Sequence, residues 1–437
     1  MNFIITKEEF AIIVRSTLDF LNIIFDNFFN FLLFITIIIS LSYLLIAIYT
    51  LSTNKKKNKI KYKFEEKKAP FVTIQIPTYN ELAAIQCAKK CLDMDYPKDK
   101  YEIIIGDDSK DKSISQKIDV FAKSENLIKV TRRGNNKGFK AGNLNHMLKF
   151  SKGDIIVLFD SDFTPKSDFL KRIVAPFIHD KNIPAVQARW NSINAKQNII
   201  SLLGSTIIAV CHKIILPYIY KRRNFGFLCG SAEAVRKSLL IKLGGWKTGS
   251  LTEDIEYSLR LLKNNHRVVY LENLECDGEV PYKPKDLYKQ QMRWAYGVIM
   301  AFKEHGKDIT FNKKLNVEDK IYAYLDLSGY MISMLLLGLT LTGLLSFITH
   351  TPEPINLIKF FSELGRNIIL TSGLVITAVI AQGMSKNTKS PLKVIGSFFS
   401  YGLIVVYYVN IGIIKAIFNK PMQWFMLEKN SNKTIAE

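Results

Sequence analysis

Two carboxylates, Asp160 and Asp162, stand two positions apart directly after the apolar run 154–159. If that run is a buried strand, both carboxylates lie at its carboxyl end, where α/β sheets bind ligands. Paired oxygen donors of this kind can hold Mg²⁺ or Mn²⁺, which bridge to phosphate oxygens. Such a triplet also arises by chance, but its position after a strand favours a metal site.

Two other apolar runs, 71–76 and 102–106, are followed by residues suited to hold a nucleoside. An aromatic ring there can stack on the base, and a carboxylate can accept hydrogen bonds from base or ribose. A strand-end Asp is more often a helix cap, so each signal alone is weak. The residues concerned are Thr78, Tyr79, Glu81 and Asp108.

A basic segment with three glycines, residues 132–143, opens an expected helix. Its backbone amides and Lys140 could meet a diphosphate. It lacks the spacing of a Walker P-loop, and a solvated basic loop is an equal alternative.

Two further segments carry polar residues beside apolar sequence. Glu253 and Asp254 open an expected helix, a position that the helix dipole alone would favour. In the amphipathic stretch 286–303, helical spacing places Gln290, Arg293 and Trp294 on one side. An Arg beside a Trp can also be a simple anchor at a membrane surface.

Apolar runs alternate with amphipathic stretches between residues 70 and 285, which predicts a mostly parallel sheet covered by helices. This α/β domain would position the strand-end residues at one edge. The amphipathic segment 286–320 follows it.

Long apolar stretches flank this domain. Residues 28–51 could cross a bilayer, after an N-terminal segment 1–27 and before a lysine-rich linker 52–69. The excess of lysine after this span predicts that the following domain is cytoplasmic. The region 322–417 is expected to hold about three more spans (322–349, 367–384 and 392–417), followed by a basic tail, 418–437.

The net charge of +21 suits anionic partners, such as lipid headgroups or phosphorylated small molecules. No nucleic-acid-binding signature accompanies it, and the densest lysine cluster flanks a membrane span, so nucleic acid is not an expected partner. The five cysteines show no zinc-type spacing and are expected to be ordinary reduced thiols.

Taken in order, these segments resemble the processive members of glycosyltransferase family 2. Those include cellulose synthases, the plant cellulose-synthase-like mannan synthases, and chitin, hyaluronan and poly-N-acetylglucosamine synthases. The resemblance covers about residues 70–305. It is closest to the cellulose and mannan synthase branch in three segments: Gln187-Ala188-Arg189-Trp190, Phe227-Leu228-Cys229-Gly230-Ser231 and Gly244-Gly245-Trp246.

The resemblance implies a GT-A domain flanked by transmembrane helices, and a role for each matching residue. Nucleotide-sugar binding would fall to Thr78, Tyr79, Glu81, Asp108, Lys140 and Asp160, and metal binding to Asp160 and Asp162. Asp254 would be the catalytic base, with Glu253 beside it and Arg293 steadying the leaving diphosphate. The acceptor would meet Cys229, Gly230, Ser231, Gln290, Trp294 and Trp190.

The expected function is therefore inverting, metal-dependent transfer of hexose from a UDP- or GDP-sugar to a growing β-linked polysaccharide at the cell membrane. The alternative is a non-processive transferase that makes a glycolipid. Four spans in one chain are few to enclose a polysaccharide channel. Translocation of the product would then need an oligomer or accessory export proteins. Residues 424–429 faintly echo the gating segment of bacterial cellulose synthases. Three crossings after the catalytic domain, however, would put that tail on the opposite side, where it could not gate. Either residues 367–384 do not cross fully or the echo is accidental, and three crossings are favoured.

Overall fold

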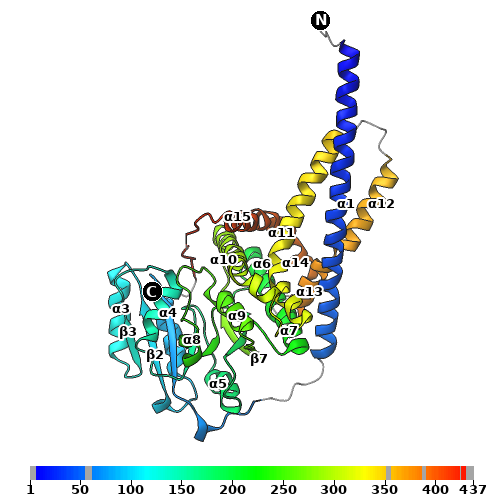
Figure 1. The fold of residues 1–437 in the computed structure, drawn as a ribbon. Helices are drawn as coiled ribbons and strands as arrows, with labels where there is room; N and C mark the ends of the chain where they lie inside the picture. Colours follow the sequence, from blue (N-terminus) through cyan, green and yellow to red (C-terminus); the bar gives the residue numbers. More distant parts are fainter. Residues whose placement is uncertain (1–5, 55–61, 351–355, 386–389, 424, 430–437) are drawn as a thin grey trace.

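The computed structural model describes residues 6–54, 62–350, 356–385, 390–423 and 425–429. Within these residues a twisted sheet forms the centre of one domain, and long helices project from it (Figure 1). The strands are β1 (Val72–Thr78), β2 (Tyr101–Asp107), β3 (Ile128–Thr131), β4 (Ile155–Leu158), β5 (Ala185–Ser192), β6 (Glu233–Arg236) and β7 (Val269–Gly278).

The strand order is β3-β2-β1-β4-β6-β5-β7. Strands β1 to β4 pair in parallel, and β7 runs parallel to β5. The predicted, mostly parallel sheet is confirmed. Only β6 is antiparallel to both of its neighbours, β4 and β5. This reversal carries the segment before β6 across the carboxyl end of β4, next to Asp160.

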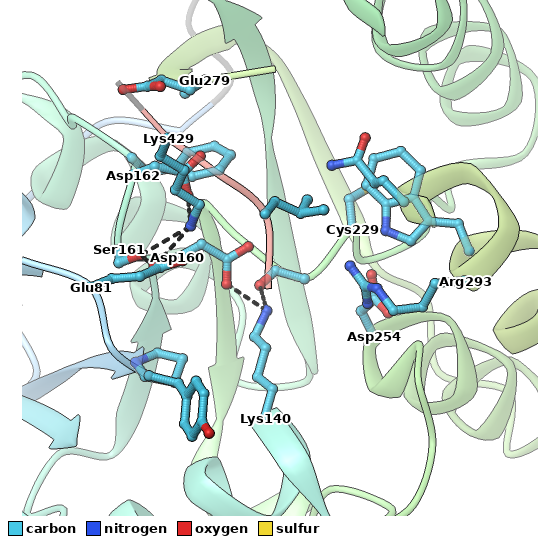
Figure 2. A pocket seen from close by; sticks show the side chains of 18 of the residues that line it. Glu81, Lys140, Asp160, Ser161, Asp162, Cys229, Asp254, Glu279, Arg293 and Lys429 are labelled. Carbon is cyan, nitrogen blue, oxygen red and sulfur yellow. Dashed lines mark hydrogen bonds and ion pairs between the residues drawn. The ribbon is translucent and has the colours of Figure 1, made fainter. Parts of the chain in front are cut away.

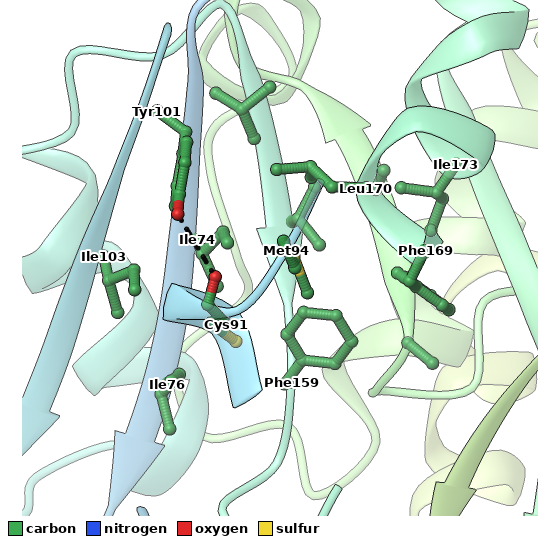
Figure 3. Close-up of a cluster of buried hydrophobic side chains, with 14 of the residues drawn as sticks. Ile74, Ile76, Cys91, Met94, Tyr101, Ile103, Phe159, Phe169, Leu170 and Ile173 are labelled. Carbon is green, nitrogen blue, oxygen red and sulfur yellow. Dashed lines mark hydrogen bonds between the residues drawn. The ribbon is translucent and has the colours of Figure 1, made fainter. Parts of the chain in front are cut away.

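Helices cover both faces of the sheet, and this explains why its strands read as continuous aliphatic runs. The domain helices are α2 (Ala83–Leu92), α3 (Lys112–Lys123), α4 (Phe139–Leu148), α5 (Phe169–His179), α8 (Lys237–Lys242) and α9 (Glu253–Lys263). On one face Ile74, Ile76 and Ile103 pack against Cys91 and Phe169 (Figure 3). Cys91 is a buried free thiol in this core.

Helix α4 approaches the sheet closely because β2 ends in glycine and aspartate. The Asn143 side chain donates to the Gly106 carbonyl at 2.7 Å, and a Cβ on Gly106 would meet Asn143 Oδ1 at 2.1 Å. This contact fixes the start of α4, and therefore Lys140, over the strand ends.

The long helices are α1 (Lys7–Asn54), α11 (Val317–Thr349) and the bent pair α12 (Leu357–Thr371) and α13 (Gly373–Ser385). Helix α1 begins well before the expected span 28–51, so most of the segment 1–27 is part of the same helix. Many large apolar side chains of these long helices are exposed. Exposed apolar surface of this extent suits lipid contact.

In the described residues, four helices are long and apolar enough to cross a membrane, or five if the bent pair, kinked by 44°, is one span. Three coincide with predicted spans. The other, Ile199–Arg223, comprises α6 (Ile199–Ala209), a π-helical turn (Val210–Ile215) and α7 (Leu216–Arg223). It is mostly buried between the sheet domain and α13, which accounts for its apolar sequence without a crossing.

The amphipathic helix α10 (Pro284–Thr310) joins the domain to the apolar helices. It packs along α15 (Leu403–Ile417), which follows α14 (Pro391–Ser397). The packing is tight because a Cβ on Gly412 would lie 2.4 Å from the Met292 carbonyl oxygen. Helix α15 therefore lies against the catalytic domain, and the chain after it returns toward the sheet (Figure 1).

Candidate active site

One pocket at the carboxyl ends of β1, β2 and β4 brings together the predicted site residues, with one exception. They converge from the ends of β1, β2 and β4, from β5, from the loop before β6, and from helices α4, α9 and α10. The pocket is lined by these residues that the sequence predicts for the site: Thr78, Tyr79, Glu81, Asp108, Lys140, Asp160, Asp162, Trp190, Cys229, Gly230, Glu253, Asp254, Gln290, Arg293 and Trp294. The exception is Ser231.

Ser231 is fully buried behind the pocket wall, so its expected contact with the acceptor is wrong. Its hydroxyl instead accepts from the Asp160 backbone N–H at 2.9 Å, and its carbonyl accepts from Trp190 Nε1 at 2.8 Å. Ser231 therefore supports two residues that do line the pocket.

Asp108, at the end of β2, forms an ion pair that the sequence did not reveal. Arg133 binds Asp108 through Nε at 2.9 Å and Nη2 at 2.5 Å, and both side chains are largely buried. Burial raises the pKa of Asp108, although Arg133 opposes this shift. Arg133 also donates to the Phe139 carbonyl, so the ion pair ties the end of β2 to the start of α4.

Lys140 lies among carboxylates at the centre of the pocket (Figure 2). Its ammonium is 2.8 Å from Asp160 and 3.3 Å from Glu253, and it donates to the Gly230 carbonyl at 2.5 Å. Burial alone would lower the pKa of Lys140, but Asp160 and Glu253 raise it overall. The charged ammonium is thus held where a diphosphate would enter.

The carboxylates of Glu81, Asp160 and Asp162 line the other side of the same region. Two ammonium groups, from Lys140 and Lys429, lie against them and show that the pocket attracts cations here. Oxygen donors in a site that already holds cations fit a hard divalent ion. Asp160 and Asp162 therefore fit the metal-binding role predicted for them.

Lys429 reaches this site from the C-terminal tail (Figure 2). Its Nζ lies 3.0 Å from both Glu81 and Asp162, and 3.1 Å from the Ser161 hydroxyl. Burial would lower the pKa of Lys429, but Asp162 and Glu81 raise it overall. The ammonium therefore occupies the position of a cation at the predicted metal ligands.

The tail is held at the pocket mouth by contacts with the start of α10. Tyr282 Oη donates to Glu428 at 2.7 Å, Lys283 pairs with the same carboxylate, and the Glu428 backbone N–H donates to Asp286. The expectation that the tail lies on the far side from the catalytic domain is therefore wrong. The sequence contained one indication of this position, the resemblance of residues 424–429 to the gating segment of bacterial cellulose synthases. Trp424 of that segment lies outside the described residues.

Asp254 stands at the first turn of α9 and faces the loop before β6 that holds Cys229 and Gly230. This segment is called the acceptor-side loop below, because the sequence predicts that it contacts the acceptor. A Cβ on Gly230 would lie 3.1 Å from the Asp254 carboxylate, so glycine at φ +87° leaves room for the carboxylate there. Burial, reinforced by the neighbouring Glu253, raises the pKa of Asp254 to about 7, against the pull of Lys140. A carboxylate with this pKa suits a general base near neutral pH.

Helix α10 supplies the remaining predicted group, Gln290, Arg293 and Trp294. Arg293 is partly buried and donates to the Leu251 carbonyl at 3.0 Å. Burial lowers the pKa of Arg293, while Glu253 and Asp160 oppose this shift. Because a guanidinium keeps its proton even then, Arg293 is a fixed positive charge within the pocket.

Glu233, which sequence reasoning missed, anchors the acceptor-side loop from behind. One of its oxygens accepts from the Gly230 N–H at 2.8 Å and the Cys229 N–H at 3.2 Å. Burial, with a further contribution from Asp254, raises the pKa of Glu233 to about 8. No chain motif marks this residue, because its role depends on the antiparallel insertion of β6.

Residues 69–297, just over half of the chain, match the family described as "Glycosyltransferase like family 2". The chain belongs to this family. Proteins similar in sequence to this glycosyltransferase include plant enzymes of the cellulose-synthase-like branch. "Probable glucomannan 4-beta-mannosyltransferase 1" of Arabidopsis thaliana is 31% identical over 58% of this chain and 47% of its own length. "Glucomannan 4-beta-mannosyltransferase 2" of the same plant is 29% identical over 61% and 53%.

The glycosyltransferase thus spans about half the length of the curated relatives it matches. Among solved structures, a mannosyltransferase of Pyrobaculum calidifontis in complex with GDP-Man and Mn²⁺ aligns with a TM-score of 0.59. That alignment covers 89% of this chain and all of the other, at 17% identity. At this identity the likeness shows the GT-A fold of the glycosyltransferase.

Proposed function

We propose that this glycosyltransferase transfers hexose units, mannose first among them, from a nucleotide-diphospho-sugar to the end of a β-linked polysaccharide. The observation that carries the proposal is the partly buried group of Asp254, Lys140 and Arg293 within one pocket. The cluster combines a base that titrates near neutral pH with two cations. Transfer of a sugar away from a diphosphate requires this combination.

The reaction would proceed by direct displacement. Asp254 would take the proton of the acceptor hydroxyl as that oxygen attacks the anomeric carbon, opposite the departing diphosphate. Lys140 and Arg293 would stabilise the negative charge that develops on the leaving group. One displacement inverts the anomeric configuration, so the enzyme needs no covalent nucleophile. A divalent ion bound by Asp160 and Asp162 would supply further positive charge for the diphosphate.

The choice of donor rests on the similar proteins. The plant relatives are named as glucomannan 4-β-mannosyltransferases, and the archaeal structure contains GDP-Man and Mn²⁺. We therefore place GDP-mannose with Mn²⁺ first, ahead of Mg²⁺ and of UDP-hexoses. Asp108, held by Arg133, and Tyr79 would contact the nucleoside.

The enzyme would work at the cell membrane with its sheet domain in the cytoplasm. Helices α1, α11 and the bent pair α12–α13 would cross the bilayer, and α14–α15 would lie against α10 at the surface. Two crossings after the catalytic domain, rather than three, return the tail to the cytoplasmic side. This agrees with the position of Lys429 in the pocket. Export of the product would then need a second copy of the chain or accessory proteins.

The test is product synthesis by purified membranes given labelled GDP-mannose, GDP-glucose, UDP-glucose and UDP-N-acetylglucosamine, each with Mn²⁺ or Mg²⁺. The Asp254→Asn variant is the blank, because it keeps the shape of the pocket but removes the base. We expect a long polymer from GDP-mannose and none from the blank.

Two results would change the proposal. Substantial turnover by Asp254→Asn would remove Asp254 from its role. A short, lipid-extractable product would replace the polysaccharide synthase with a glycolipid transferase.

A further inference from the structure

Three soft ligands meet behind the acceptor side of the pocket: Cys211, His212 and Cys229. One sulfur or nitrogen atom from each lies within 4.8 Å of the others. They come from segments far apart in the fold, because Cys211 and His212 lie on the π-helical turn and Cys229 lies on the loop before β6. Turns of this kind are rare and often occur at functional sites.

Outside the carboxylate site at Asp160 and Asp162, the described residues bring together a second group of potential ligands, Glu256, Glu304 and His305, and it is already neutralised. Arg260 binds Glu256 at 2.8 Å and His305 binds it at 2.9 Å. The cysteine–histidine cluster contains no acidic group, and neither of its cysteines is joined in a disulfide. The Cys229 thiol donates to the Phe227 carbonyl at 3.8 Å.

The donor set points to one class of ion. Two sulfurs and an imidazole are typical ligands of Zn²⁺, whereas Mg²⁺ and Mn²⁺ prefer oxygen. Zinc binds sulfur at about 2.3 Å and nitrogen at about 2.0 Å, so the three ligand atoms would have to approach one another by about 1 Å. The loop that carries Cys229 contains Gly230 in a left-handed conformation and could accommodate such a shift.

The surroundings favour ligation. His212 is 2% exposed and stacks on Trp190, with ring centroids 5.1 Å apart, so its ring orientation is fixed. Its Nδ1 meets the Trp190 backbone N–H only at a long 3.4 Å.

We propose that Cys211, His212 and Cys229 form a site for Zn²⁺ or a similar thiophilic ion, distinct from the carboxylate site at Asp160 and Asp162. Water from the pocket would complete the coordination. Of the three ligands only Cys229 lines the pocket. Metal binding would therefore fix the acceptor-side loop, whose Gly230 carbonyl accepts from Lys140. The consequence is inhibition of transfer by micromolar zinc, without loss of nucleotide binding.

The binding test uses the full chain, reduced and freed of metal, and Co²⁺ as the probe, because a thiolate–Co²⁺ bond gives a charge-transfer absorption that carboxylates do not. We expect one equivalent to produce the band in the wild type and Zn²⁺ to abolish it. Cys211→Ser should lose the band and bind zinc at least tenfold more weakly. Cys276→Ala removes a thiol outside the cluster and should keep the band, as should Asp162→Asn.

An unchanged band in Cys211→Ser, or a band lost in Asp162→Asn, would overturn the site. A disulfide between Cys211 and Cys229 in the protein as isolated would do so too. None of these readouts needs turnover, so the result stands apart from that for the proposed function. In a transfer assay, zinc should inhibit the wild type but not Cys211→Ser; equal inhibition of both would refute the link to the acceptor loop.

Discussion

Replacing Lys429 by alanine should increase the affinity of the pocket for Mn²⁺. In the structure the Lys429 ammonium lies 3.0 Å from both Glu81 and Asp162, and its side chain is 17% exposed. An ion at Asp162 must displace it. The tail therefore competes with the metal, and removing its charge leaves the carboxylates free to bind Mn²⁺.

The size of the effect follows from these contacts. A hydrogen bond to a charged group contributes about 1.5–3 kcal/mol net. Lys429 makes more than one, but ordering the tail offsets part of the gain, so we take about 1.5–3 kcal/mol for the whole contact. That corresponds to a roughly ten- to hundredfold lower Kd for Mn²⁺ in Lys429→Ala.

Electron paramagnetic resonance of free Mn²⁺ measures this Kd directly, without nucleotide or turnover. Lys420→Ala is the matched control, because it removes an exposed positive charge from the same tail and should leave the Kd unchanged. Equal Mn²⁺ affinity in Lys429→Ala and the wild type, or weaker affinity in the variant, would refute the competition.

Two further predictions concern charge in the catalytic domain. The pKa of Asp254 is raised to about 7, and transfer requires its carboxylate. The value of kcat/KM should therefore fall about tenfold per pH unit below that pKa and level off above it. A profile that stays flat down to pH 5.5 would contradict the role of Asp254 as the base. Arg133→Ala leaves Asp108 buried without its partner and should cost about 3 kcal/mol of stability. Thermal unfolding followed by fluorescence should show this loss beside Lys68→Ala, the exposed control, which should unfold like the wild type.

Much of the catalytic domain could be predicted because its signals are local. Buried parallel strands are continuous aliphatic runs, and each is followed by the polar residues of its own carboxyl end, as with Asp108 and Asp162. Since the carboxyl ends of parallel strands meet at one edge, residues far apart in the chain could be placed in one pocket. The amphipathic spacing of Gln290, Arg293 and Trp294 likewise placed that group on one side of a helix.

The position of the tail could not be predicted because an apolar helix can have two kinds of surroundings. Such a helix is equally apolar whether lipid or protein surrounds it, so neither the burial of Ile199–Arg223 nor the packing of α15 on α10 follows from composition. A count of apolar spans after the sheet domain therefore could not decide on which side of the membrane the tail lies. Ser231 was misplaced because the reversal of β6 turns its side chain behind the pocket wall.

The sequence by itself determined the family and the sheet domain, and it indicated the candidate base, cations and carboxylates, since these depend on residue type and on periodicity along the chain. Only the tertiary structure decided which charges neutralise one another: Arg133 with Asp108, Lys140 with Asp160, and Lys429 with Asp162. The last pair joins positions 267 residues apart in the chain. Such a contact is fixed by how the helices between them pack, and no local pattern records that packing.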